Sequence, residues 1–361
     1  MKYPALIINR ESVLINARAV AELCRSSGIG VWGVTKGLSG DPRLAAIYEA
    51  AGFEGCADSR LMNLKKIREA GVYAPLLMMR IAMRSELEEL AATADVSLQS
   101  EISTIKALDE ICASRRVAHD VLLMTDVGDL REGFWETELA DAAAHLRDLS
   151  GGVRIKGVAT NFACASGVLP TPENMTRLVK FRDIVASVMK QELPVISVGG
   201  TCCLKMIESG LTPREVNALR LCEGILLGMD TAFGRAIPWL SRDALRIEAE
   251  IVECRDKPSV PTGETGMQAF GEKPVFTDRG MRRRAILAIG RQDVNVDRIT
   301  PMDEGVEIVT ASSDHLILDV TEAIKTAPHE RFEPGAIMSF RPLYPAMLAC
   351  STSPYVENIF E

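Results

Sequence analysis

A single lysine at the end of an apolar segment is the residue of this sequence with the clearest potential for chemistry. Residues 31–36 read Val-Trp-Gly-Val-Thr-Lys, and Gly37 and a polar turn follow. We interpret the segment as a buried strand that delivers the Lys36 amine to its C-terminal end, where parallel α/β folds place their chemistry. Partial burial favours the neutral amine, which can form a Schiff base with an aldehyde. Taken alone, the segment favours a lysine that extends into solvent, and its neighbours along the chain reverse that preference.

Polar residues also follow two later predicted strands. Residues 126–133 read Asp-Val-Gly-Asp-Leu-Arg-Glu-Gly, a loop in which Arg131 is a rigid fork for a carboxylate or a phenolate. An interpretation of Arg131 as an exposed arginine on a solvated loop, with no ligand, is favoured equally by the sequence. The next strand ends at Thr160-Asn161, which either point over the strand ends or simply cap a buried strand.

Small residues in the next part of the chain predict a phosphate site. The run Ser197-Val198-Gly199-Gly200-Thr201 precedes a helical stretch, where free backbone N–H groups and hydroxyls bind anions, and Gly224-Ile225 could supply further donors. Arg220 lies in an apolar run between them, and a buried arginine is costly unless it is paired. Arg220 therefore has two possible roles, a structural ion pair with Glu223 or donation of a hydrogen bond to a ring nitrogen.

The elements that must position these residues alternate up to residue 235. Strand-like runs are 31–36, 52–58, 74–80, 96–100, 121–126, 155–161, 195–200 and 218–227. Helical spacing is found at 18–26, 42–51, 61–70, 85–92, 102–114, 137–149 and 175–191. This alternation predicts a TIM-type (β/α)8 barrel over residues 10–235. An open doubly wound sheet is the alternative, and no glycine-rich dinucleotide fingerprint supports it.

The remainder of the chain predicts a mostly β second domain, residues 236–361 together with 1–9. Its strand-like runs are 244–254, 284–289, 306–311, 316–320 and 336–340, and the turn-rich segment 257–266 cannot be helical. The first strand, 4–9, precedes the first barrel helix, so we expect it to pair with this domain. At a strand junction, Asp314-His315 suggests a catalytic dyad, but adjacent strand residues face opposite ways, so only one is expected to face a site.

Composition excludes several classes of function. The 361 residues are 47% hydrophobic and carry a formal net charge of −8, which argues against nucleic acid as the main partner. No apolar stretch is long enough to span a membrane, and the N-terminus lacks an apolar signal region, so we expect a cytoplasmic protein. Nine scattered cysteines and four histidines show no zinc-type spacing, so we expect reduced thiols and no metal.

The chain resembles the fold-type III pyridoxal-phosphate enzymes, and most closely the alanine/ornithine racemase family. Val34-Thr35-Lys36 looks like the cofactor-lysine strand, and residues 126–133 are similar to an Asp-Thr-Gly-x-x-Arg-x-Gly loop. Ser313-Asp314 and 319–321 are similar to a Met-Asp…Asp-Val-Thr stretch near the substrate carboxylate. Residues 288–294 and the tail 344–355 resemble ornithine racemase most closely. The resemblance covers nearly the whole chain.

This resemblance implies a barrel and a β domain in a homodimer with shared active sites, and pyridoxal 5′-phosphate held by Lys36. It implies that Arg131 contacts the phenolic oxygen and the substrate, that Arg220 faces the pyridine nitrogen, and that Ser313 and Asp314 lie near the substrate. The remaining implied cofactor contacts are Asn161, Ser197, Gly199, Gly200, Thr201, Gly224, Ile225 and Tyr344.

The sequence departs from alanine racemase at the second base. Thr262 stands nearest the position of the family's catalytic tyrosine, and Asn161 stands at the position of its supporting histidine. A threonine hydroxyl is a poor base near neutral pH, so Asp314, His315, Tyr344 or water is expected to replace it. Met124 stands where some alanine racemases have a modified lysine.

The resemblance implies an isomerase that interconverts L- and D-amino acids, with ornithine or another basic amino acid as substrate and alanine second. A related amino acid decarboxylase is the alternative, and it would require Glu223 rather than Arg220 at the pyridine nitrogen. The candidates for binding a distal amine are Asp126, Asp129, Glu132 and Glu264.

Overall fold

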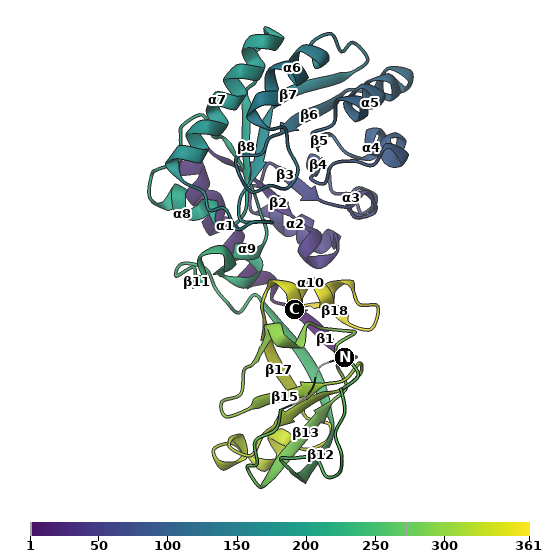
Figure 1. The fold of residues 1–361 in the computed structure, drawn as a ribbon, viewed down its shortest axis with the longest axis vertical. Helices are drawn as coiled ribbons and strands as arrows, with labels where there is room; N and C mark the ends of the chain where they lie inside the picture. The colour runs from purple at the N-terminus through teal and green to yellow at the C-terminus, as the bar shows by residue number, and fades with distance from the viewer. Residues whose placement is uncertain (1, 272, 274) are drawn as a thin grey trace. The chain divides into compact units, whose positions relative to one another are not determined.

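The chain forms two compact units. The computed structural model describes residues 2–271, 273 and 275–361. One unit is Arg10–Arg242, and the other joins Asp243–Glu361 to the N-terminal segment that ends at Asn9. Figure 1 shows a barrel covered by helices in the first unit and a sheet-rich second unit. The units divide after Arg242, whereas the sequence places the boundary at residue 235.

The strands of the first unit form a closed parallel barrel in sequence order. Because β2 pairs with both β3 and β9, the first and last strands are hydrogen-bonded. The predicted (β/α)8 barrel is therefore confirmed, and the open doubly wound sheet is wrong. The barrel strands are β2 (Gly30–Val34), β3 (Gly55–Asp58), β4 (Leu76–Met78), β5 (Val96–Gln99), β6 (His119–Met124), β7 (Val153–Asn161), β8 (Val195–Gly199) and β9 (Ala218–Leu221).

Helices cover the outside of this barrel (Figure 1). α1, for example, buries a stripe that includes Val13, Ala17, Val20 and Cys24, the spacing of one helix face. These helices are α1 (Arg10–Ser26), α2 (Pro42–Ala50), α3 (Leu61–Glu69), α4 (Leu87–Thr93), α5 (Ile102–Arg115), α6 (Leu139–Leu146), α7 (Pro172–Met189), α8 (Cys203–Glu208) and α9 (Glu223–Leu227). A short hairpin of β10 (Met229–Asp230) and β11 (Arg235–Ala236) follows α9.

One predicted barrel strand is only half right. The sequence predicts a strand over 218–227, but β9 ends at Leu221 and residues 223–227 form α9, which ends at Gly228 with a φ of +61°. A short apolar run that is buried on all sides fits a strand and a helix equally well, so its periodicity cannot decide between them. The left-handed Gly228 stops the helix and turns the chain into β10.

The second unit is built on an eight-stranded sheet among the described residues. β1 pairs antiparallel with β12 and parallel with β18, which confirms that the first strand joins the β domain. Helix α10 (Tyr344–Thr352) was not predicted. The strands are β1 (Ala5–Ile8), β12 (Leu245–Pro258), β13 (Met281–Leu287), β14 (Ile299–Pro301), β15 (Glu307–Ala311), β16 (Leu316–Asp319), β17 (Ile337–Pro342) and β18 (Glu357–Phe360).

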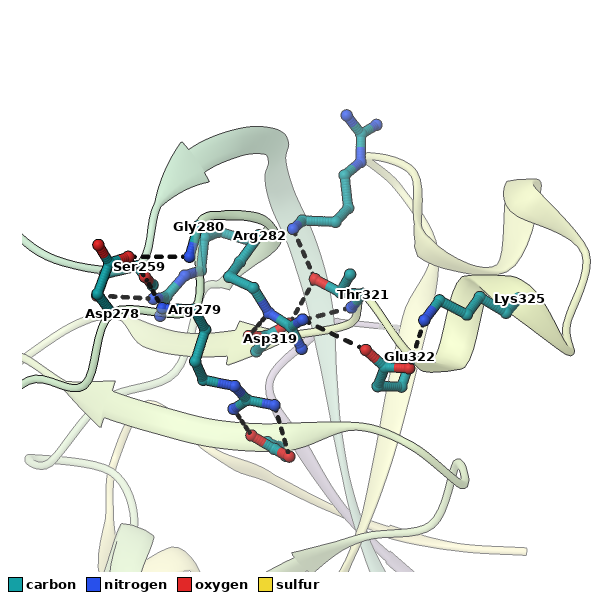
Figure 2. Close-up of polar contacts among 12 residues, drawn as sticks. Ser259, Asp278, Arg279, Gly280, Arg282, Asp319, Thr321, Glu322 and Lys325 are labelled. Carbon is teal, nitrogen blue, oxygen red and sulfur yellow. Dashed lines mark hydrogen bonds and ion pairs between the residues drawn. The ribbon is translucent and has the colours of Figure 1, made fainter.

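A polar cluster ties β13 to the segment that follows β16 in this sheet. Figure 2 shows the Arg282 side chain between Asp319 and Glu322, with the Arg282 Nε to Asp319 Oδ2 distance at 2.8 Å. Thr321 donates its hydroxyl to Asp319 at 2.7 Å and accepts the backbone N–H of Arg283 at 2.8 Å. Asp319 and Thr321 belong to the run that resembles a substrate-binding stretch, and here they anchor the sheet.

Candidate active site

Lys36 lies immediately beyond the C-terminal end of β2, in the short 3-10 turn Lys36–Leu38. The strand before it is fixed by two contacts. Tyr48 packs so closely on β2 that a Cβ on Gly33 would lie 2.1 Å from its ring, and its hydroxyl donates to the Val34 carbonyl at 3.3 Å. The Thr35 hydroxyl donates to Asp58 Oδ2 at 2.7 Å. The backbone that carries Lys36 is therefore held by neighbours on both sides.

Asp58 is a buried carboxylate that the sequence reading missed. It ends β3, is fully buried, and also accepts hydrogen bonds from the Arg60 amide and the Asn63 side chain, each at 3.0 Å. Burial raises the pKa of Asp58 above its ordinary value, against the opposing effect of these hydrogen bonds. An acid at the end of a predicted barrel strand was the available signal.

The Lys36 amine is half-buried beside two thiols. Burial raises the pKa of Cys222 to about 12, and the charge of Lys36 opposes that rise. Cys164 as a residue is exposed, but partial desolvation of its thiol raises the pKa of that group, against the charges of Arg131 and Lys36. The charge of Lys36 therefore acts on thiols that follow β9 and β7. Within the described residues Lys36 forms no ion pair, so its amine is available to a ligand.

Arg220 is a buried cation inside the barrel, and its hydrogen-bond partners among the described residues are neutral oxygens. Its guanidinium donates to the Thr160 carbonyl at 2.8 Å, to Asn161 Oδ1 at 3.0 Å and to the Ser197 hydroxyl. Burial lowers the pKa of Arg220 to about 10, so the group remains protonated at neutral pH. The predicted alternative of an ion pair with Glu223 is wrong, because Glu223 instead accepts hydrogen bonds from the Thr231 hydroxyl and amide.

A chain of side chains joins Arg220 to Arg131. Asn161 accepts from Arg220 and donates to Glu132 Oε1 at 3.3 Å, and Glu132 is paired with Arg131. The structure therefore brings Asn161, Ser197 and the predicted arginines into one network at the C-terminal end of the barrel. Gly199 makes this possible, because a Cβ there would lie 2.5 Å from Asn161 Oδ1 and 2.7 Å from Arg220 Nη2.

The predicted phosphate loop contains free donors, although fewer than the sequence suggested. The amide of Gly200 donates to the Arg220 carbonyl, that of Gly224 to the Thr201 hydroxyl, and that of Ile225 to the Cys222 carbonyl. Among the described residues, the amides of Thr201 and Cys202 donate to no acceptor, although both residues are buried. Adjacent unpaired amides beside a hydroxyl are a donor set that fits a phosphate.

The other predicted site residues belong to the second unit. Asp314 is exposed and accepts hydrogen bonds from the Ser313 hydroxyl at 2.6 Å and from Gln292. His315 is exposed beside them, and Thr262 is exposed in the turn-rich segment after β12. Tyr344 begins α10. No barrel residue replaces the missing tyrosine as an evident second base in the described part of the chain.

The described residues offer neither a metal site nor a membrane-spanning helix. Within residues 2–271, 273 and 275–361, no group of three or more His, Cys, Asp or Glu residues could hold a metal ion. None of the helices described is both long and apolar enough to cross a membrane.

Comparison with known proteins gives matches over the whole chain. Residues 8–220 match the family described as alanine racemase, N-terminal domain. The chain is 38% identical over 361 residues to the lysine racemase of Thermotoga maritima, covering 100% of this chain and 99% of the relative. It is 35% identical over 358 residues to the ornithine racemase of Acetoanaerobium sticklandii, covering 99% of each. In fold it is similar to the alanine racemase of Streptomyces lavendulae, with a TM-score of 0.77 at 14% identity over 100% of this chain and 97% of that one.

Proposed function

Because the chain belongs to the alanine racemase family, we propose that it is a pyridoxal-phosphate-dependent racemase of basic amino acids, ornithine or lysine in particular. The observation that supports this most directly is the convergence of three groups at one end of the barrel. They are the unpaired Lys36 amine, the buried Arg220 guanidinium and the free amides of Thr201 and Cys202. The relatives that match over the full length are named as racemases of lysine and of ornithine.

The residues of the barrel fit this cofactor. Lys36 would hold its aldehyde carbon, the amides of Thr201 and Cys202 with the Thr201 hydroxyl would bind its phosphate, and Arg131 would contact its phenolic oxygen. Arg220 would face its ring nitrogen. When bound, pyridoxal phosphate is the electron sink that makes the Cα–H of an amino acid acidic.

Lys36 and Arg220 have separate tasks in this proposal. The Lys36 amine removes or returns the proton on one face of Cα, a contribution worth roughly 10²–10⁴-fold in rate. Arg220 stays cationic at neutral pH, so it would donate to the ring nitrogen of the bound cofactor and disfavour protonation of that nitrogen. This role of Arg220 would favour return of the proton to Cα over side reactions.

The second proton-transfer group is proposed to come from the β domain. Asp314 and His315 are exposed and titratable, and Tyr344 is the third candidate. In this proposal the protein is a homodimer with shared active sites, so the group on the opposite face belongs to a second copy of the chain. The cytoplasmic location expected from the sequence remains a prediction.

Glu132 is the acid best placed to recognise a distal amine. The Asp129 carboxylate already accepts hydrogen bonds from backbone amides, and the Asp126 carboxylate accepts one from the amide of Gly128 at 2.7 Å. Glu132 instead interacts with two side chains, Arg131 and Asn161, which can move to admit a substrate ammonium. Glu264 belongs to the second unit.

The decarboxylase alternative is disfavoured by the surroundings of Arg220. That reaction would need an acid opposite the ring nitrogen, and Glu223 was the only candidate in sequence. Glu223 binds Thr231, and the three hydrogen-bond partners of the Arg220 side chain among the described residues are neutral oxygens. The side chains around Arg220 therefore favour racemisation over decarboxylation.

The proposal is tested by incubating the purified protein and pyridoxal phosphate with each of the common amino acids, followed by chiral chromatography and measurement of released gas. We expect racemisation of ornithine or lysine, no gas, and loss of activity in Lys36→Ala. Borohydride fixation of the cofactor and peptide mapping should place the label on Lys36. A label on another residue, or gas release without racemisation, would overturn the proposal.

A further inference from the structure

The loop after β7 is held by a single buried carboxylate from the loop after β6. Asp129 Oδ2 accepts the backbone N–H groups of Cys164 at 3.0 Å and Ala165 at 2.9 Å. Its Oδ1 accepts those of Ser166 at 3.1 Å and Val168 at 3.2 Å. Residues 164–167 are exposed, whereas Asp129 is 3% exposed. One backbone hydrogen bond, from the Ala163 N–H to the Val168 carbonyl at 2.8 Å, also closes this loop, and its other amide contacts come from one residue 35 to 39 positions earlier in the chain.

The clamped loop begins at the reacting groups. The Cys164 thiol interacts with the Arg131 guanidinium by a hydrogen bond and with the Lys36 amine through its charge, so the first residue held by Asp129 belongs to the candidate site. Asp129 and Arg131 belong to the same short loop, in which Leu130 has a φ of +53°. A displacement of Asp129 would therefore move both walls of the site, the Arg131 side and the Cys164 side.

We propose that Asp129 is a positioning residue for the reaction, which fixes residues 164–168 and thereby holds Cys164 between Arg131 and Lys36. This inference rests on the proposed function for its effect on rate, but the clamp itself is independent of it. Four amide donors match the acceptor capacity of one ionised carboxylate. A neutral amide side chain would turn an NH₂ group toward two of those donors, so Asn at this position cannot replace Asp.

The same chain contains a matched control at the other end of β7. Asp109 is 7% exposed and accepts the backbone N–H groups of Ser150 at 3.1 Å, Gly151 at 2.8 Å and Val153 at 2.9 Å. It clamps the segment that enters β7, at the end of the barrel opposite Lys36. Asp109→Asn therefore imposes a similar structural loss on the same strand, far from the candidate site.

The test compares Asp129→Asn with Asp109→Asn by two measurements. The first is the pH profile of iodoacetamide alkylation at Cys164, which is exposed while the other cysteines are buried. Alkylation follows the thiolate fraction, so the profile reports the pKa of this thiol. We expect an elevated pKa in the wild type and in Asp109→Asn. In Asp129→Asn the pKa should fall toward the free value of about 8.5, because the thiol loses part of its burial and the nearby Asp129 charge, both of which raise its pKa.

The second measurement is kcat/KM for ornithine or lysine. Small displacements of positioned groups cost up to about 10²-fold in rate, so we expect a loss of roughly 10- to 100-fold in Asp129→Asn and little change in Asp109→Asn. If the two variants behave alike in both measurements, Asp129 is only structural and the inference is wrong. If the wild type racemises nothing, the proposed function fails, and hydrogen exchange at the amides of residues 164–168 decides the clamp.

Hydrogen exchange on the wild-type protein keeps the inference testable if Asp129→Asn does not fold. The amides of Cys164, Ala165, Ser166 and Val168 should exchange slowly. That of Gly167 donates to no acceptor among the described residues and should exchange fast. Equal, fast exchange at all five amides would show that the loop is not clamped and would overturn the inference.

Discussion

Gly199→Ala is the substitution that tests the placement of Arg220 most directly. An added Cβ would lie 2.5 Å from Asn161 Oδ1 and 2.7 Å from Arg220 Nη2, closer than non-bonded atoms tolerate. The Gly199 backbone is held in β8 by its neighbours, so the guanidinium must move. We expect the hydrogen bonds from Arg220 to Asn161 and Ser197 to be lost.

The expected size of the effect follows from these two bonds. A hydrogen bond to a charged group contributes about 1.5–3 kcal/mol, so two of them hold the guanidinium with roughly 3–6 kcal/mol. If rotation into a nearby rotamer recovers about half of this, the loss of orientation is about 1.5–3 kcal/mol. At about 1.36 kcal/mol per factor of ten, kcat should fall roughly 10- to 160-fold.

The assay is the initial rate of L- to D-ornithine or lysine conversion by chiral chromatography, together with the absorbance of the bound cofactor. Gly266→Ala is the control, because no atom lies within 4 Å of a Cβ at that position. A Gly199→Ala protein that retains the wild-type rate and an unchanged cofactor spectrum would refute the role assigned to Arg220.

Two further outcomes are expected. Burial lowers the pKa of His119 to about 4, below an unfolded value of about 6.5, so its contribution to stability is complete above pH 6.5 and falls as the pH drops toward 4. The free energy of unfolding measured with urea should fall by about 3 kcal/mol from this cause as the pH drops in the wild type, and it should depend less on pH in His119→Gln. The same pH dependence in both proteins would contradict the role of His119. Glu132→Gln should raise KM for ornithine or lysine roughly tenfold more than KM for alanine, since a tenfold change in affinity corresponds to about 1.4 kcal/mol, close to one hydrogen bond to a charged group; equal losses for both substrates would remove Glu132 as the group that recognises the distal amine.

The sequence alone predicted the barrel and the β domain, and it assigned most of the candidate site residues to the ends of barrel strands. The alternation of apolar strands and amphipathic helices is a local pattern, and each strand end in a parallel barrel faces the same side. Lys36, Arg131, Asn161, Ser197 and Arg220 could therefore be assigned to one end of the barrel from their order along the chain.

Only the tertiary structure decided which of these residues touch one another. Arg220 binds Thr160 across 60 positions of sequence rather than its near neighbour Glu223, and Asp129 holds amides 35 to 39 residues away. Periodicity carries no information about such pairs, because they depend on which strands become neighbours and how their side chains pack. Helix α9 was not predicted for a related reason. Its apolar residues suit a buried strand as well as a helix, and the structure shows a helix that ends at Gly228.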